Sequence, residues 1–207
     1  MIELEPVDPE FYDREYYTSG TKSNYAPYGP GSWADWIVDM AMNHVKPRPS
    51  SVLDVGCAYG FLVERFWNRL GVPAWGFDIS RYAIEKQGFL GRTWVGDCAD
   101  PAAWKTVDLT LACELGEHLT PAQAQQMLRN AFTFSNRALM LIAVDLGDYD
   151  SHAETDGSHI HVVPMAWWEQ AAREAGWSVA DASAFNEDWR SSQMGWSGRW
   201  LYLTKEA

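Results

Sequence analysis

Residues Val52–Gly60 read VLDVGCAYG, an apolar run that ends in an acid and continues into a turn of small residues. The turn is spaced at every second position by Asp54, Gly56, Ala58 and Gly60. A strand followed by such a turn and by a helix, here predicted from Phe61 to Leu70, presents backbone N–H groups and a helix N-terminus to a ligand. Glycine allows positive φ or close approach of a ligand, and Ala58 shows that the middle position tolerates a methyl group. The stretch predicts a cofactor site.

An acid follows the next predicted strand. Val72 to Phe77 reads as this strand, and it stops at Asp78-Ile79-Ser80. Asp78 lies about 20 residues beyond the turn, where an α/β dinucleotide site places its ribose-binding carboxylate. A carboxylate can accept hydrogen bonds from both ribose hydroxyls. We therefore predict that Asp78 binds a ribose.

Two further motifs complete an ordered series. D-x-G-x-A-x-G is followed by GFDIS, by VGDC at Val95 to Cys98 and by LTLACELGEHL at Leu109 to Leu119. This series resembles the class I S-adenosylmethionine-dependent methyltransferases from roughly Ser50 to the C-terminus. The nearest competitor is an NAD-binding Rossmann domain, which usually carries a third glycine at the helix start and would need a separate substrate domain.

The resemblance implies an α/β fold with a mostly parallel, seven-stranded sheet and helices on both faces. It implies one methyltransferase domain over residues 1–207, with an aromatic N-terminal arm and a helix in 1–46 and a Rossmann-like core in 50–207. The alternation of predicted strands and helices from Ser51 onward independently favours a mostly parallel, covered sheet.

The resemblance also assigns cofactor roles residue by residue. Asp78 holds the ribose, and Ile79 packs on the adenine. Asp97 accepts from the adenine amino group, while the Cys98 N–H donates to a ring nitrogen; a simple Asx turn is the alternative there. Glu114 is a further cofactor-binding candidate. The turn at the methionine end is formed by Asp54, Gly56, Ala58 and Gly60.

Composition narrows the function classes. The chain has 207 residues, 47% of them apolar and 21% charged, which is typical of one globular domain. A formal net charge of −12 disfavours a nonspecific grip on nucleic acid. No apolar run approaches the ~20 residues of a membrane span. The first ten residues are acidic, unlike a signal peptide. We expect a cytoplasmic protein with no membrane partner.

The three cysteines are Cys57, Cys98 and Cys113. Their odd number and the absence of C-x-x-C spacing argue against a disulfide framework or a structural zinc site. The 12 tryptophans exceed what the core needs, so we expect some to line a substrate pocket. A contact in a homodimer is the alternative explanation.

The first 31 residues are rich in aromatic side chains. In proteins resembling this one, such a leader folds over cofactor and substrate, with Tyr25 or Tyr28 near the methionine end. The alternative is an arm that packs on the domain surface. A helix is predicted next, because apolar residues from Trp33 to His44 recur at three- and four-residue spacing; Ser32 is its predicted cap and Pro47 its stop.

The remaining predicted elements follow in order. Phe185 to Gly198, with Trp189 and Trp196 among small polar residues, is expected to form a hairpin or a lid. The predicted strands are Arg92 to Val95, Asp108 to Cys113, Arg137 to Val144, Trp177 to Ala184 and Arg199 to Thr204. The predicted helices are Pro121 to about Thr133 and Pro164 to Ala175.

Histidines after the fourth and fifth strands are the candidates for chemistry. Methyl transfer from a sulfonium needs alignment and removal of a proton from the acceptor. His118 follows the fourth strand, and His152, His159 and His161 follow the fifth. Loops at this end of an open sheet hold ligands, so His118 with His159 or His161 is predicted as base or metal ligand. Alternatively, His118 only orders its loop.

A metal site is the sharper hypothesis. Glu114-x-x-Glu117-His118 with His159 or His161 resembles the arrangement in metal-dependent members that methylate a hydroxyl next to another oxygen, such as small-RNA terminal ribose methyltransferases and ubiquinone-pathway O-methyltransferases. Such a site could hold Mg²⁺, Mn²⁺, Fe²⁺ or Zn²⁺, and the ion could chelate a diol and lower a hydroxyl pKa. The chain departs from the RNA enzymes in lacking a recognisable RNA-binding extension.

We therefore expect S-adenosylmethionine-dependent methyl transfer to a hydroxyl of a small polar molecule, such as a sugar, a catechol-like ring or a natural-product intermediate. The alternatives are a nucleic-acid or nucleotide methyltransferase and a non-catalytic S-adenosylmethionine-binding subunit.

Overall fold

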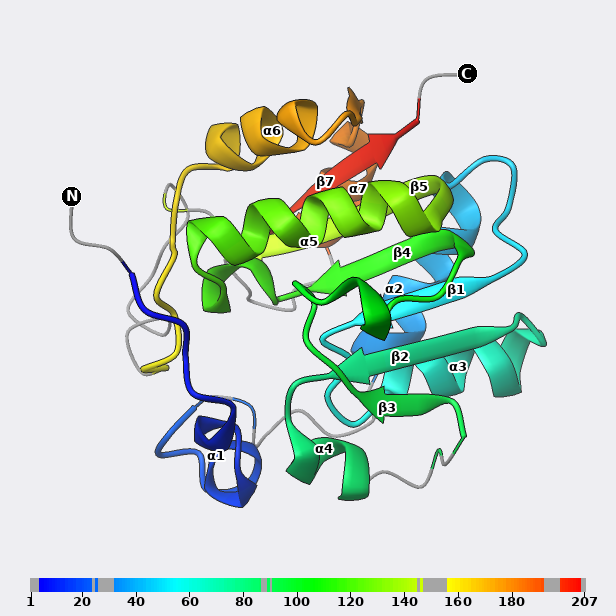
Figure 1. Ribbon diagram of the computed structural model, residues 1–207. Helices are drawn as coiled ribbons and strands as arrows, with labels where there is room; N and C mark the ends of the chain where they lie inside the picture. The colour runs from blue at the N-terminus through cyan, green and yellow to red at the C-terminus, as the bar shows by residue number, and fades with distance from the viewer. Residues whose placement is uncertain are drawn as a thin grey trace.

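The computed structural model describes residues 4–23, 25, 32–86, 89, 91–144, 146, 156–191 and 198–205. Its centre is a seven-stranded sheet in the order β3-β2-β1-β4-β5-β7-β6 (Figure 1). Strands β1 to β5 pair in parallel, whereas β7 is antiparallel to both of its neighbours. The strands are β1 (Val52–Val55), β2 (Ala74–Asp78), β3 (Thr93–Val95), β4 (Val107–Cys113), β5 (Ser135–Val144), β6 (Ser178–Ala180) and β7 (Gly198–Thr204). The predicted mostly parallel, seven-stranded sheet is confirmed.

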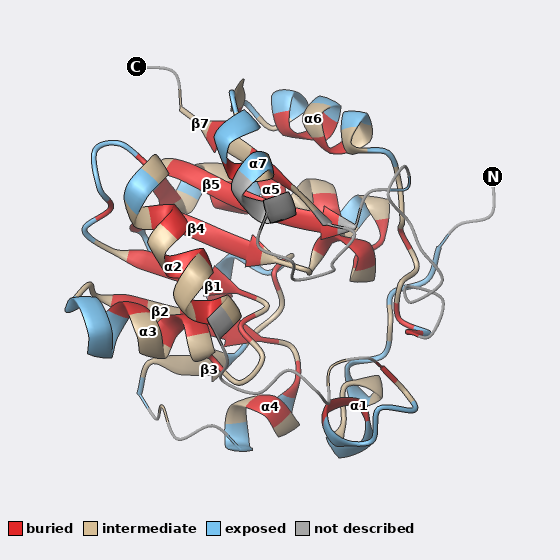
Figure 2. Ribbon diagram, turned by 180° about the vertical axis from the view of Figure 1, so that it is seen from behind, coloured by how far each residue is buried: buried red, intermediate tan, exposed pale blue. Residues whose placement is uncertain are grey.

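Helices cover both faces of the sheet, as predicted. Helices α5 and α6 lie on the face toward the viewer in Figure 1, and α2, α3 and α7 lie on the face shown in Figure 2. The longer helices are α2 (Ser32–His44), α3 (Phe61–Leu70), α5 (Pro121–Phe134), α6 (Met165–Glu174) and α7 (Ser183–Ser191). The short ones are η1 (Pro9–Phe11), α1 (Arg14–Thr18), α4 (Arg81–Lys86), η2 (Pro101–Ala103) and η3 (Gly116–His118).

The core consists of two apolar layers, one on each face of the sheet. Alternate residues of β5 point to opposite layers: Leu139 and Leu141 belong to the layer under α5 and α6, whereas Met140 and Ile142 belong to the layer under α2 and α3. A strand covered on both faces is apolar at every position, which explains the uninterrupted runs in the sequence. Figure 2 shows these central strands as buried.

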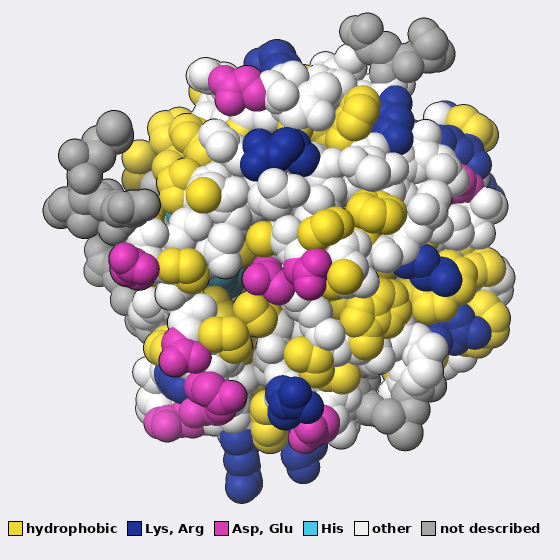
Figure 3. Space-filling view, viewed as in Figure 1, with side chains coloured by type: hydrophobic (Ala, Val, Ile, Leu, Met, Phe, Trp, Pro, Cys, Tyr) yellow, Lys and Arg dark blue, Asp and Glu magenta, His cyan; other side chains and the backbone are white. Residues whose placement is uncertain are grey.

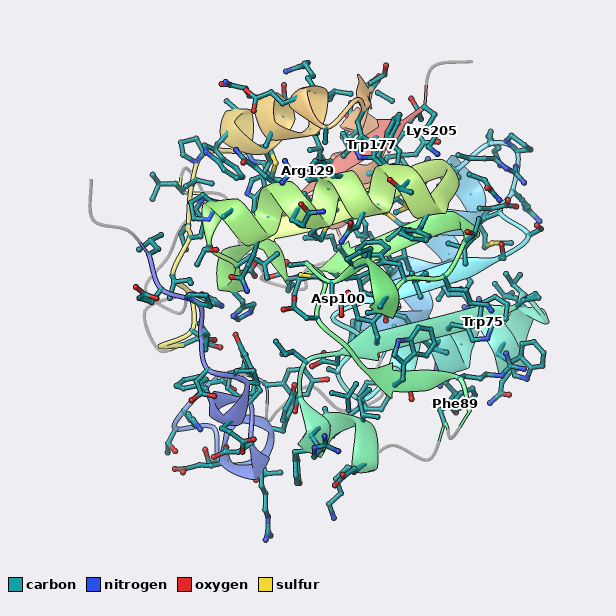
Figure 4. The ribbon with its side chains drawn as sticks, viewed as in Figure 1. Trp75, Phe89, Asp100, Arg129, Trp177 and Lys205 are labelled. Carbon is teal, nitrogen blue, oxygen red and sulfur yellow. The ribbon has the colours of Figure 1, made fainter. Side chains whose placement is uncertain are left out.

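Trp177 belongs to the apolar layer under α5 and α6. The Trp177 Nε1–H donates to the Leu128 carbonyl at 3.0 Å, so the start of β6 is tied to α5. Figure 4 shows Trp177 beside this helix. Buried tryptophan therefore serves packing at this position, with its polar atom satisfied by backbone.

The C-terminal region corrects the sequence prediction. Only Ser178–Ala180 of the predicted strand Trp177 to Ala184 is extended, and α7 replaces the predicted hairpin or lid from Phe185 to Ser191. The Asp181 side chain accepts from the Ser183 N–H at 2.9 Å, which begins the helix. Phe185 then packs on Trp200 of β7. Trp196 and its neighbours from 192 to 197 lie outside the described residues.

The N-terminal arm packs beside the carboxyl ends of β1 and β2. Tyr16 and Tyr17 of α1 are buried against Ala83 of α4 and against partly buried rings that include Tyr59. The Ser80 hydroxyl, just after β2, donates to the Tyr12 carbonyl at 2.6 Å. The arm therefore reaches the edge of the sheet where the predicted site lies. Among the described residues, no helix has the length and apolar character needed to cross a membrane.

Candidate functional site

The turn after β1 has the left-handed backbone that its small residues permit. Gly56, Ala58 and Gly60 have φ values of 75°, 45° and 69°. A Cβ atom at Gly56 would lie 3.0 Å from Leu115 Cδ1, so this turn packs directly on the loop after β4. Helix α3 begins immediately after the turn. The two loops that sequence analysis assigned to cofactor and acceptor are therefore in contact.

Asp78 links the end of β2 to the same turn. Its Oδ2 accepts from the Ala58 N–H at 2.8 Å, and its Oδ1 accepts from the Ser80 N–H at 2.7 Å. Burial raises the pKa of Asp78, and these two backbone hydrogen bonds oppose that rise. Asp54 is buried nearby, and its pKa is raised by burial and by the charge of Asp78. The Asp78 carboxyl is thus fixed in orientation at the carboxyl end of β2.

The turn after β3 contains the Asx turn that was the alternative to an adenine site. Asp97 Oδ1 accepts from the Ala99 N–H at 2.8 Å, which uses one of its two carboxylate oxygens. The Cys98 carbonyl accepts from the Asn130 Nδ2 at 2.9 Å and from the Trp104 Nε1 at 3.0 Å. These bonds hold the turn against α5 and η2, and the Asx turn leaves Asp97 Oδ2 as a further acceptor.

The loop after β4 carries a strained acid. Glu114 has a φ of 49°, and it shares a positive φ with Ala58 alone among the described non-glycine residues. Such backbone is costly for a side-chain-bearing residue and is concentrated at functional sites. Burial raises the pKa of Glu114 to about 7, and a side-chain hydrogen bond with Glu117 opposes this rise. Glu117 itself is buried in η3.

Two imidazoles lie beside these acids. The rings of His118 and His159 meet edge to face with centroids 4.8 Å apart. Burial, together with the neighbouring His159, lowers the pKa of His118 to about 4. A neutral imidazole can accept a proton or bind a metal ion. Figure 3 shows histidine atoms only as small patches recessed between other side chains on this face.

One acid and two imidazoles form a group suited to an ion. Ligand atoms of Glu117, His118 and His159 all lie within 4.8 Å of one another. Glu114 and His161 are not members of this group. His161 instead donates its backbone N–H to the Glu117 carbonyl at 3.0 Å and places its ring 4.4 Å from that of Trp167, centroid to centroid.

Asp156 is a residue that sequence analysis missed. Its Oδ1 accepts from the backbone N–H and the hydroxyl of Ser158, and its Oδ2 accepts from the Tyr16 hydroxyl at 2.9 Å. The Ser158 Oγ lies 2.8 Å from the His118 Nδ1. Asp156 closes an acidic segment that reads as a loop, and the signal was the Asp-x-Ser spacing of an Asx turn directly before His159.

Of the two tyrosines predicted near the methionine end of the cofactor, Tyr25 is among the described residues. Tyr25 lies against the cofactor turn, with its ring centroid 4.8 Å from that of Tyr17 and 5.8 Å from that of Tyr59. Burial raises the pKa of Tyr25. Tyr28 and His152 lie outside the described residues.

Comparisons with known proteins identify the family of the chain. The family described as methyltransferase domain matches residues 25–182, which is more than half of the chain. None of the curated protein sequences matches this one.

Solved structures show the same fold at low identity. The magnesium protoporphyrin IX methyltransferase of Synechocystis PCC 6803, solved with bound S-adenosylmethionine, is 15% identical with a TM-score of 0.69, over 98% of this chain and 100% of that one. A chain from the complex between the Haloferax volcanii Trm112 methyltransferase activator and a protein assigned as a methyltransferase is 15% identical with a TM-score of 0.70, over 97% of this chain and 100% of that one.

An O-methyltransferase family protein from Burkholderia thailandensis is 16% identical with a TM-score of 0.63. The similarity covers 84% of this chain but only 57% of that longer one. The family match, the order of the strands and the glycine turn beside Asp78 lead to one assignment. The chain belongs to the methyltransferase domain family, among the class I S-adenosylmethionine-dependent methyltransferases.

Proposed function

We propose that the protein transfers a methyl group from S-adenosylmethionine to a hydroxyl of a small polar molecule, such as a sugar, a catechol-like ring or a natural-product intermediate. The observation that carries this proposal is the group formed by the buried Glu117 and the partly buried His118 and His159, in the loops next to the glycine turn after β1. An oxygen nucleophile needs help with its proton, and this group offers an acceptor for it.

The cofactor half follows from the turn and the two strand ends. When bound, S-adenosylmethionine supplies an electrophilic methyl group on a sulfonium. We assign Asp78 to the ribose hydroxyls because its two oxygens are already oriented by backbone N–H groups. Asp97 Oδ2, Cys98 and Ile79 are assigned to the adenine. The methionine end is assigned to the turn with Asp54, Gly56, Ala58 and Gly60, and to Tyr25 and Glu114 beside it.

His118 is the proposed base on the acceptor side. Its lowered pKa of about 4 keeps the imidazole neutral at physiological pH, so it can take the proton of an acceptor hydroxyl. His159 is the second candidate, since its ring contacts that of His118. Aligned in-line attack also requires that the acceptor be held in one orientation, which the enclosing loops and the arm favour.

The same residues fit a divalent ion. One carboxylate and two imidazoles suit Mn²⁺, Fe²⁺ or Zn²⁺ better than Mg²⁺. Glu117, His118 and His159 would hold the ion, with Glu114 and His161 outside the group. When bound, the ion would lower the pKa of a coordinated hydroxyl. We propose metal assistance as the alternative to proton removal by His118, because the three ligand atoms already converge.

Two other functions are less well supported. The net charge of −12 weighs against a nucleic-acid acceptor, which would require clustered basic residues. A non-catalytic S-adenosylmethionine-binding subunit would not need this group of one acid and two imidazoles.

Calorimetric titration tests the proposal. Metal-stripped protein is titrated with S-adenosylmethionine and S-adenosylhomocysteine, and then with Mn²⁺, Zn²⁺ or Mg²⁺. Micromolar cofactor binding supports methyl transfer, and a separate metal isotherm directs the acceptor search to diols. Absence of cofactor binding under all conditions would overturn the proposal. The exposed Glu169→Gln on α6 serves as the matched carboxylate control.

A further inference from the structure

A buried chain of hydrogen bonds leads from the N-terminal arm to His118. Tyr16 of α1 donates to Asp156 Oδ2 at 2.9 Å, and the Ser158 hydroxyl donates to Asp156 Oδ1. Ser158 Oγ then lies 2.8 Å from His118 Nδ1. Tyr16, Asp156 and Ser158 are all at most 6% exposed. The chain is therefore shielded from water, which could otherwise exchange for any of its members.

The number of protons on each group determines which atom donates in each of these hydrogen bonds. Carboxyl oxygens accept hydrogen bonds, whereas hydroxyl and backbone N–H groups donate them. Three donors reach Asp156: the Tyr16 hydroxyl, the Ser158 hydroxyl and the Ser158 backbone N–H. Serine has one hydroxyl proton, and it is used toward Asp156. The Ser158 oxygen can then only accept from His118, so the His118 Nδ1 carries the proton.

We infer that Asp156 and Ser158, anchored by Tyr16, are positioning residues that hold His118 as the Nδ1–H tautomer and leave Nε2 as its reactive atom. The inference rests on the proposed function, because it states which nitrogen of the proposed base or ligand acts. Nε2 is on the opposite side of the ring from the bond to Ser158, so orientation and tautomer are set together. A partner of this kind typically affects metal affinity or activity by roughly 10–100-fold.

These hydrogen bonds also connect the N-terminal arm to the proposed base. Tyr16 and Asp156 are separated by 140 residues, and their bond joins α1 to the segment after β5. The His159 Nε2 lies 3.9 Å from the same Asp156 Oδ2, so one carboxylate faces both imidazoles of the group. Placement of the arm and orientation of the two histidines are thus coupled through Asp156.

The tautomer can be observed directly in the whole protein. Two-bond ¹H–¹⁵N correlation spectra of protein labelled in its five histidines distinguish a protonated from an unprotonated ring nitrogen. The His118 signals are assigned by comparison with His118→Gln. We expect a protonated Nδ1 and an unprotonated Nε2 at neutral pH. An Nε2–H tautomer, or rapid exchange between the two, would overturn the inference.

Variants separate positioning from simple packing. Ser158→Ala and Asp156→Asn should lose the single tautomer, whereas Ser158→Thr, which keeps the hydroxyl, should retain it. We also expect Zn²⁺ affinity, measured by calorimetry, to fall roughly 10–100-fold in Ser158→Ala and to recover in Ser158→Thr. Unchanged spectra in folded Ser158→Ala would contradict the inference. Failure of the proposed function would appear separately, as absent S-adenosylmethionine binding with the tautomer intact.

Discussion

The backbone N–H of Ala58 donates to Asp78 Oδ2 at 2.8 Å across 20 residues of sequence. This hydrogen bond holds the turn after β1 against the end of β2. The turn has little freedom to move away from the acid, so the proposed cofactor site is largely preorganised. Preorganisation lowers the ordering cost of binding.

Replacing Asp78 should weaken the cofactor site. In Asp78→Ala we expect S-adenosylhomocysteine affinity to fall about 10–100-fold, because hydrogen bonds to a charged group contribute about 1.5–3 kcal/mol. Calorimetry measures this change. The exposed Glu169→Gln should bind as the wild type does. Wild-type affinity in folded Asp78→Ala would remove the ribose assignment.

Replacing His118 should separate binding from chemistry. In His118→Gln we expect turnover to fall about 100-fold or more, because a positioned base typically contributes 10²–10⁴-fold. S-adenosylmethionine affinity should remain close to wild type. Labelled methyl transfer to a panel of sugars, catechols and diols measures turnover. His44→Gln on α2, where the ring packs on Phe185, is the histidine control. A fully active His118→Gln would show that His118 only orders its loop.

Glu114 and Glu117, the two acids of the loop after β4, should behave differently toward metal. Glu117 belongs to the three-residue group and Glu114 does not. We expect the Zn²⁺ or Mn²⁺ isotherm of metal-stripped protein to be lost in Glu117→Gln and kept in Glu114→Gln. Chelator treatment should likewise reduce turnover of the wild type. Equal loss of the isotherm in both variants would mean that the ion is held by a different set of residues.

Asp108 should make stability depend on pH in acid. Burial opposes ionisation, but hydrogen bonds from Ser50 and Asn136 and the charge of Arg137 lower its pKa overall. A lowered folded-state pKa contributes stability above the unfolded value, and this stability is lost as pH falls through the folded pKa. Asp108→Asn should therefore lose about 1–3 kcal/mol in free energy of unfolding at pH 7.

This loss should shrink below about pH 4, near the ordinary pKa of an aspartic acid. Urea unfolding of both proteins from pH 7 to pH 3 measures it. Glu169→Gln is the control, and it should change the free energy of unfolding little, since Glu169 forms only a surface ion pair with Arg173. A constant difference between wild type and Asp108→Asn at all pH values would contradict the prediction.

Gly116 should tolerate no side chain. A Cβ atom there would lie 2.5 Å from Trp168 Cζ2, in a fully buried contact between η3 and α6. We expect Gly116→Ala to cost about 1–3 kcal/mol in free energy of unfolding. Gly157→Ala is the matched control, because its Cβ would meet only Phe11 Cζ at 3.8 Å. Thermal unfolding compares the two, and equal melting temperatures would show that Trp168 can move aside.

The sequence predicts the sheet well because its pattern is local. Residues 138–144 of β5 are all apolar, and α5 carries its own start signals at Thr120 and Pro121. The cofactor turn and Asp78 are equally visible, since spacing alone places them at neighbouring strand ends. The prediction was wrong at the start of α7. Alternating small residues there favour a strand, but in the structure the segment is helical and packs Phe185 on Trp200 of β7.

Asp156 could not be found in the same way. Its importance comes from Tyr16, 140 residues earlier in the chain, and from His118 through Ser158. Such contacts depend on tertiary packing, which no local spacing encodes. The grouping of Glu117 rather than Glu114, and of His159 rather than His161, is likewise visible only in the folded protein.

The antiparallel strand β7 has a practical consequence for work on this enzyme. Because it runs against β5, its last residues meet the first residues of β5, and the Lys205 N–H donates to the Arg137 carbonyl at 3.1 Å. That edge of the sheet is opposite the loops that hold the histidines (Figure 1). A fluorophore attached to Lys205 would therefore be remote from the loops that hold the histidines, whereas one on α1 would adjoin Tyr16, which donates to Asp156 in those loops.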